Sequence, residues 1–167
     1  MLEVIPLDGV ATLVASWFVY DHGAPLWLIG VGRIDGAKAH VVVNGGSGAS
    51  FPPAFDPQAV HYTQWGALDF EFDSDRSGTV RWNSTLPGFG SGELPITQLV
   101  RADLPTQDPG GAPLRACHSG NWYDPQQNGH GFFLDVFHLA NGERQLMAVW
   151  YVYDRGAPLY LVGAAWL

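Results

Sequence analysis

The sequence predicts an all-β fold, an antiparallel barrel or sandwich of about ten short strands that contains an internally repeated hairpin. Three observations support this fold class. Apolar residues make up 47% of the 167 residues, which is enough for a core, and 21 glycines with 12 prolines indicate many tight turns. No segment keeps apolar residues at helical spacing over several turns. Instead, several segments alternate apolar and polar residues, as strands with one wet face do.

The clearest predicted hairpin spans residues 67–82. Apolar and acidic residues alternate before the polar loop 74–78, and apolar residues return at alternate positions after it. Such a period of two places all the apolar side chains on one face of a sheet. The apolar face of this hairpin consists of Leu68, Phe70, Phe72, Val80 and Trp82.

Three further hairpins, two of which are copies of one pattern, and two single strands complete the predicted sheet. Asp21 to Pro25 has turn chemistry and separates two apolar runs, and the same pattern recurs at Asp154 to Pro158. The pair Asn128-Gly129 predicts another turn. The strands expected around these turns include residues 13–20, 26–31, 121–125 and 131–137. The two single strands are residues 40–44 and 94–100.

The chain repeats itself. Residues 17–30 (WFVYDHGAPLWLIG) and 150–163 (WYVYDRGAPLYLVG) are identical at ten of fourteen positions. The similarity extends backwards, with a one-residue gap, to 2–4 and 134–136. A repeat of this length indicates a duplicated structural unit.

The repeat divides the chain into three parts. Residues 1–101 hold most of a first copy, 102–116 form a Pro/Gly-rich connector, and 117–167 form the opening third of a second copy. About four strands with two bulky faces cannot bury themselves. We therefore expect 117–167 to pack on the first copy as one domain.

Charge and cysteine content exclude several classes of protein. Eight basic residues against sixteen acidic ones argue against a nucleic-acid partner, which would require a basic surface. No apolar run reaches the length of a membrane span, and no signal-peptide pattern is found in this chain. Cys117 is the only cysteine, so we expect no internal disulfide.

The sequence resembles a repeat module of secreted and surface-associated bacterial proteins. The matching residues are 118–133 (HSGNWYDPQQNGHGFF), the two W-[FY]-V-Y-D-x-G-A-P-L-[WY]-L hairpins, 64–72 and 88–99. The resemblance implies a fold and a secreted or cell-surface location. Because the module has no established activity, the resemblance assigns no catalytic residues. The opening pattern S-G-x-W-Y is present at Ser119 to Tyr123 and is missing before Leu2.

The candidate ligand-binding residues are aromatic: Trp27, Trp65, Trp122, Tyr123 and Tyr160. Such side chains stack on sugar rings or flat apolar ligands, and their N–H and O–H groups bind polar atoms. The alternative is that these residues are core or cross-strand packing partners, as aromatic residues in β-folds commonly are.

One loop is a weak candidate for calcium. Asp73, Asp75 and Ser77 follow the alternate spacing of the first ligands in a calcium loop, but Ser84 stands where the bidentate acid belongs. A solvated hairpin loop with side-chain-to-backbone turns explains the same residues.

Three functions remain open at this point. The first is a non-catalytic extracellular binding module that recognises glycan or another surface ligand. The second is a structural or adhesive repeat that assembles with neighbouring copies, including a homodimer by strand exchange. The third is a small β-barrel enzyme. No catalytic motif at a recognisable spacing supports the enzyme. Calcium is the only cofactor that the sequence suggests.

Overall fold

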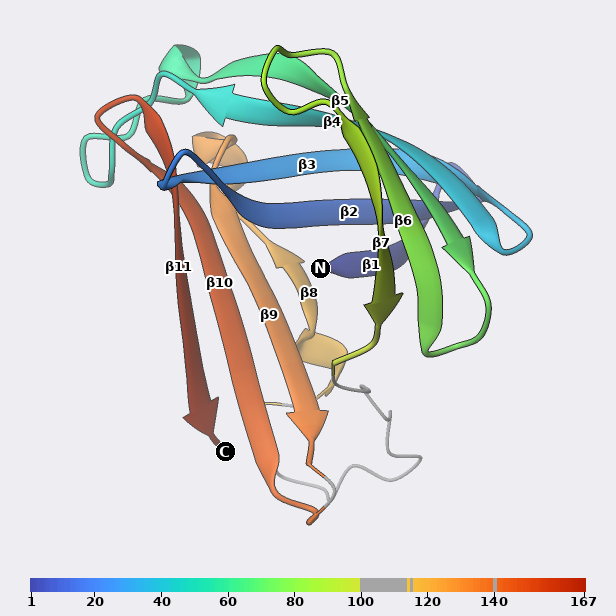
Figure 1. Ribbon diagram of the computed structural model, residues 1–167. Helices are drawn as coiled ribbons and strands as arrows, with labels where there is room; N and C mark the ends of the chain where they lie inside the picture. The colour runs from blue at the N-terminus through green and yellow to red at the C-terminus, as the bar shows by residue number, and fades with distance from the viewer. Residues whose placement is uncertain (100–113, 115, 140) are drawn as a thin grey trace.

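The computed structural model describes residues 1–99, 114, 116–139 and 141–167, and within them it has eleven strands in two antiparallel sheets. Figure 1 shows the two sheets, and neither of them closes into a barrel. The prediction of an all-β antiparallel fold with a repeated hairpin is confirmed. Of the two alternatives, the sandwich is the one that forms.

The first sheet is a seven-stranded meander in which each strand pairs with the next. It coils strongly, so that β6 and β7 lie across β1 and β2 (Figure 1). Its strands are β1 (Leu2–Leu7), β2 (Val10–Asp21), β3 (Ala24–Asp35), β4 (Lys38–Ser47), β5 (His61–Phe72), β6 (Ser77–Ser84) and β7 (Ser91–Thr97).

The second sheet has four strands in the order β11-β10-β9-β8. Three short 3-10 turns accompany the strands, at Pro57–Ala59, Ala116–His118 and Pro125–Gln127. The strands are β8 (Gly120–Trp122), β9 (Gly131–His138), β10 (Arg144–Asp154) and β11 (Ala157–Trp166).

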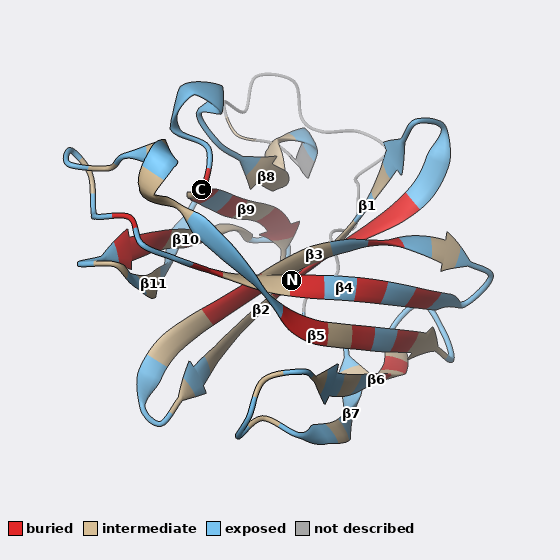
Figure 2. Cartoon of the chain, turned by 90° about the horizontal axis from the view of Figure 1, so that it is seen from above, coloured by how far each residue is buried: buried red, intermediate tan, exposed pale blue. Residues whose placement is uncertain are grey.

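The alternation of residue types decides which face of each strand is buried. Buried and exposed residues alternate along β4 (Figure 2), and Val41 and Val43 are fully buried. On the opposite face, Arg81 forms ion pairs with Glu71 and Glu93, each at 3.1 Å. The predicted hairpin at 67–82 is therefore present as β5 and β6, with one apolar and one charged face.

Both copies of the repeated hairpin close with the same two-residue turn. His22 and Gly23 have φ angles of 48° and 87°, and Arg155 and Gly156 have 49° and 86°. Two consecutive positive φ angles define a type I′ turn, whose twist matches that of the flanking strands. The turn is shorter than the predicted five residues, because β3 and β11 begin at the alanine before the proline.

Other predicted boundaries differ from the structure at strand ends. β8 ends at Trp122 because Pro125 begins a 3-10 turn, whereas the sequence predicts a strand to Pro125 itself. β7 begins three residues before Leu94 and ends at Thr97. Val100 and most of the predicted connector 102–116 lie outside the described residues.

The two sheets pack face to face through the repeated hairpins. Trp27 is 1% exposed, its ring lies 5.4 Å from that of Tyr151 and 5.5 Å from that of Tyr153, and its indole N–H donates to the carbonyl oxygen of Val152 at 3.2 Å. One side chain of the first sheet is thus held by three consecutive residues of β10.

The same contact occurs in the reverse direction. Tyr160 occupies the place of Trp27 in the second hairpin, and its ring lies 5.3 Å from that of Phe18 and 5.9 Å from that of Tyr20. Phe18 and Tyr20 are the counterparts of the two tyrosines that contact Trp27. The hairpins therefore meet isologously, each using the same positions, as subunits do across a twofold axis.

Candidate functional site

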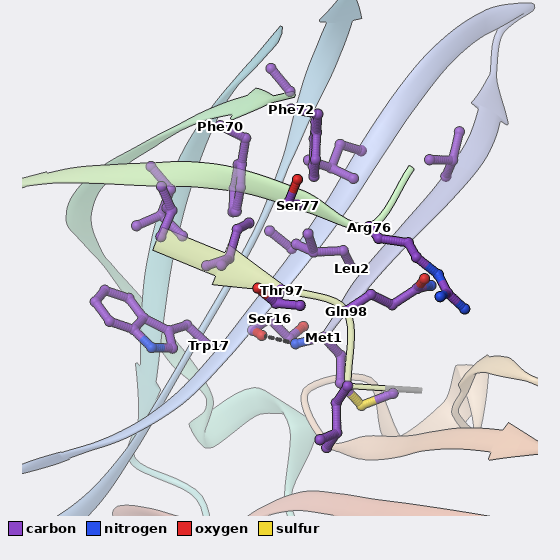
Figure 3. Close-up of a pocket in the computed structure, with 18 of the residues that line it drawn as sticks. Met1, Leu2, Ser16, Trp17, Phe70, Phe72, Arg76, Ser77, Thr97 and Gln98 are labelled. Carbon is purple, nitrogen blue, oxygen red and sulfur yellow. Dashed lines mark hydrogen bonds between the residues drawn. The ribbon is translucent and has the colours of Figure 1, made fainter. Parts of the chain in front are cut away.

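A cavity of about 700 Å³ lies inside the coil of the first sheet. Figure 3 shows Leu2, Phe70 and Phe72 around this cavity, with Trp17 at one end. These residues come from β1, β2 and β5, because coiling brings both ends of one sheet to the same space. We call this cavity the interior pocket.

Strand alternation and small residues together create the interior pocket. Leu68, Phe70 and Phe72 project inward from β5 at alternate positions. Ala15 and Ala39, which also line the pocket, are buried on neighbouring strands and leave volume that larger side chains would fill. The lining is thus apolar and only partly occupied by its own side chains.

Trp17 lies at one end of the pocket, and two further tryptophans pack against it. The ring of Trp17 lies 5.9 Å from that of Trp65 in an edge-to-face arrangement and 5.8 Å from that of Trp82. Phe89 packs on Trp65 from the other side at 5.4 Å. Aromatic clusters of this kind are rigid and well packed, so this end provides a fixed wall.

Polar groups lie at the other end and along the edge nearest the second sheet. Arg76 and Gln98 lie at the end opposite Trp17 (Figure 3), next to Thr97. Asp135 of β9 also borders the pocket, and burial raises the pKa of its carboxyl, although the Ser119 hydroxyl donates to it at 3.3 Å. The pocket therefore combines an apolar interior with polar groups at its rim.

A second, smaller cleft of about 390 Å³ lies between the two sheets. Tyr62, Tyr123 and Tyr151 line it, together with Asn121 and His130. Burial raises the pKa of Tyr151 to about 12 and lowers the pKa of His130. Both residues are therefore neutral at pH 7 and present hydrogen-bonding groups without charge. We call this cleft the inter-sheet cleft.

The structure does not bring the five predicted ligand-binding residues together. Trp27 is buried between the sheets, and Trp65 is 4% exposed in the core behind Trp17. Tyr160 packs on the first hairpin. Trp122 and Tyr123 are 48% and 57% exposed, and of the five only Tyr123 lines a cavity, the inter-sheet cleft.

The residues that line the interior pocket were missed by the sequence interpretation. The period-two pattern of β5 assigns Phe70 and Phe72 to an apolar face, but it does not show that this face borders a cavity. Ala15 and Ala39 carry no signal in a single sequence, because small residues occur at many sites. Coiling of the sheet, which depends on all seven strands, decides the outcome.

Of the predicted calcium residues, Asp73 and Asp75 lie in the exposed loop between β5 and β6, and Ser77 is the first residue of β6. Ser77 Oγ lies 2.8 Å from Ser74 Oγ, and the Asp73 N–H donates to the Ser77 carbonyl oxygen at 3.0 Å. Asp75 borders the interior pocket. Throughout the described ranges no three His, Cys, Asp or Glu side chains are grouped to hold a metal ion. The loop is therefore accounted for by turn hydrogen bonds.

The helices of the described chain are single 3-10 turns, and none of them has the length and apolarity needed to cross a membrane.

No protein-family model, curated protein or solved structure matches the chain.

Proposed function

We propose that this protein is a non-catalytic binding module that takes a small apolar ligand into the interior pocket. The observation that supports this proposal is the pocket itself, about 700 Å³ of space lined by inward-facing apolar side chains. Ligand sites in proteins commonly have volumes of roughly 300–1,000 Å³, mostly apolar walls and a few polar groups. The interior pocket matches this description.

The distribution of polar groups suggests the form of the ligand. An apolar body would pack against Phe70, Phe72 and the aromatic wall at Trp17. A polar head would lie near Arg76 and Gln98 at the other end. We therefore propose an amphiphile with a rigid or short apolar body and a neutral or anionic head. The acidic chain and its resemblance to surface modules favour an extracellular location.

The residues that line the interior pocket do not favour catalysis. Asp135 is the one carboxyl of the pocket whose pKa burial raises, and none of the lining residues is a histidine or a cysteine. General acid-base or nucleophilic catalysis requires a second group within hydrogen-bond reach of the first. The hydrogen-bond partner of Asp135 is the Ser119 hydroxyl, and we therefore propose binding and not catalysis.

The test uses a neutral apolar fluorophore, N-phenyl-1-naphthylamine, with the variants Ala39→Leu and His40→Leu. Residue 39 faces the pocket, and residue 40, next to it on β4, lies on the exposed opposite face. We expect Ala39→Leu to weaken binding by about tenfold because it fills ligand space, while His40→Leu leaves binding unchanged. Equal affinity for both variants would exclude the interior pocket as the binding site.

Glycan binding at the inter-sheet cleft is a second candidate. The observation in its favour is the gathering of Tyr62, Tyr123 and Tyr151 with the Asn121 amide, since rings and amides together bind sugars. Tyr123→Ala should abolish a glycan-dependent change in tryptophan fluorescence, while Trp122→Ala, which lies outside the cleft, should retain glycan binding. If no member of a broad glycan panel changes the tryptophan fluorescence, this candidate is ruled out.

A further inference from the structure

β1 is an edge strand with an exposed apolar character. It stands at the end of the seven-stranded order, and no other strand of the described chain pairs with its outer side. Val4 is 65% exposed, and Leu2 and Leu7 are also exposed. An exposed apolar edge of this kind is a template for pairing with another strand.

The second copy of the repeat shows which strand pairs with the equivalent edge there. Leu2 lies opposite Ala15 in the first sheet, and their counterparts Leu134 and Ala148 lie opposite each other in the second. β9 is therefore the counterpart of β1 in register as well as in sequence. On the outer side of β9, Gly120 of β8 lies opposite Leu134.

The backbone groups of the two edges also correspond. The Ser16 N–H donates to the Met1 carbonyl oxygen at 2.9 Å, so alternation along an antiparallel pair turns the N–H and C=O of Val4 away from β2. In β9 the counterpart of Val4 is Val136, whose N–H donates to the Ser119 hydroxyl at 2.8 Å. The edge of β1 offers the same donor without this acceptor.

We propose that the outer edge of β1 binds the Ser119 to Tyr123 segment of a second copy of this chain by β-strand addition. Gly120 of the added strand lies opposite Leu2, and the Ser119 hydroxyl accepts from the Val4 N–H. Within its own chain, the donor segment pairs with β9 through three residues, Gly120, Asn121 and Trp122. The described part of the chain thus carries both an edge to which no strand is paired and the strand that pairs with that type of edge.

In the intact chain the Asn121 amide donates to the Glu3 carboxylate, so β8 already lies beside β1 without pairing with it. Gly120 removes the steric obstacle to close backbone approach, as glycines in strands often do. Leu2 and Val4 also line the interior pocket, so strand addition is measured in the absence of a pocket ligand.

The experiment uses the full chain and a fluorescein-labelled peptide with the sequence of residues 118–126. Fluorescence anisotropy measures peptide binding, and hydrogen exchange measures protection of the Leu2 and Val4 amides. We expect saturable binding and exchange slowed by about tenfold or more at these two amides. A scrambled peptide should neither bind nor protect them.

Two proline substitutions test the backbone geometry. Val4→Pro in the chain removes the outward N–H and leaves the inward hydrogen bonds of β1 to β2, so we expect affinity to fall by about tenfold or more. A peptide with proline in place of Gly120 loses a donor on the other side and should weaken to a similar extent. This peptide is tested on the unaltered chain, so the result stands even if Val4→Pro impairs folding.

Three results would overturn the proposal. These are absence of peptide binding at millimolar concentration, binding without protection of Leu2 and Val4, and equal affinity for the proline-containing peptide. Binding of N-phenyl-1-naphthylamine is measured in separate samples without the peptide, so failure of strand addition is distinguished from failure of the interior pocket.

Discussion

Gly46 shows how the absence of one side chain fixes the distance between the two sheets. A Cβ atom at this position would lie 2.6 Å from the Trp27 ring and against the Tyr153 hydroxyl. Both rings are buried and held by neighbouring aromatic residues, so neither has space to move. At the adjacent Gly45, a Cβ would meet Leu28 and Leu26 at ordinary distances of 3.6 and 3.8 Å.

We predict that Gly46→Ala destabilises the protein by about 1–3 kcal/mol through overpacking of the inter-sheet core. Gly45→Ala should change the free energy of unfolding by less than about 1 kcal/mol, because its methyl group has space. Urea unfolding of both variants measures the difference. Equal stability of the two variants would show that the sheets separate easily at this point.

Because of Asp135, the free energy of unfolding decreases as pH rises. A surface carboxylate in an ion pair has the opposite effect. Burial raises the pKa of Asp135 above its ordinary value of 3.8, so the folded state disfavours the charged form. The contribution of Asp135 to stability is therefore fully present below that ordinary value and is lost as pH rises through the raised pKa. An asparagine keeps the acceptor for Ser119 and removes the charge.

We predict that Asp135→Asn becomes more stable relative to the unaltered protein as pH rises from 3.5 to 7. The comparison uses the difference between the two urea midpoints at each pH, which cancels the titration of other carboxyls. A difference that stays constant over this range would mean that Asp135 ionises in the folded state as it does in the unfolded one.

At the scale of elements, the type I′ turn is the feature that the two hairpins share most closely. Arg155 and His22 occupy the first turn position with positive φ angles, which asparagine adopts at lower cost than either of them. The side chains are exposed, so their replacement disturbs little packing.

We predict that Arg155→Asn and His22→Asn each stabilise the protein by about 0.5 kcal/mol. Gly156→Ala should destabilise it by about 1 kcal/mol, because its φ of 86° strains any residue with a Cβ. Thermal or urea unfolding gives these values. A loss of stability in both asparagine variants would contradict the turn assignment.

Strands and turns were predictable from the sequence because their signals are local. The alternation at Leu68 and Phe70 and the glycine at the centre of each repeated turn depend on a few neighbouring residues. The partner of each face depends on distant residues instead. Trp27 and Trp65 look alike in the sequence, yet Trp27 joins the two sheets and Trp65 packs in the core of the first sheet against Trp17. Coiling of the whole sheet decides between these roles.

At the scale of the molecule, the second sheet covers an apolar face of the first. That face includes Phe18 and Trp27 of the first hairpin, and Val60 and Phe55 pack beside it. Without the second sheet these side chains would be exposed to water. Because the hairpin contact is isologous, a second copy of the first hairpin offers a complementary surface for them.

We predict that a fragment of residues 1–99 self-associates through the face that contains Phe18 and Trp27, whereas the full chain does not use that face. Sedimentation velocity at micromolar concentrations should show a dimer of the fragment. The same fragment with Phe18→Glu should be monomeric, because a charge would be buried in the contact. A monomeric fragment with the melting temperature of the full chain would contradict this account.

The reciprocal contact between the hairpins also has an evolutionary consequence. A surface that is complementary to itself needs only one gene segment to encode both of its sides. An ancestor with a single copy would therefore already have been able to form a homodimer. Duplication and fusion then place both sides in one polypeptide. Once fused, the sides are free to diverge, as tryptophan and tyrosine have done at Trp27 and Tyr160.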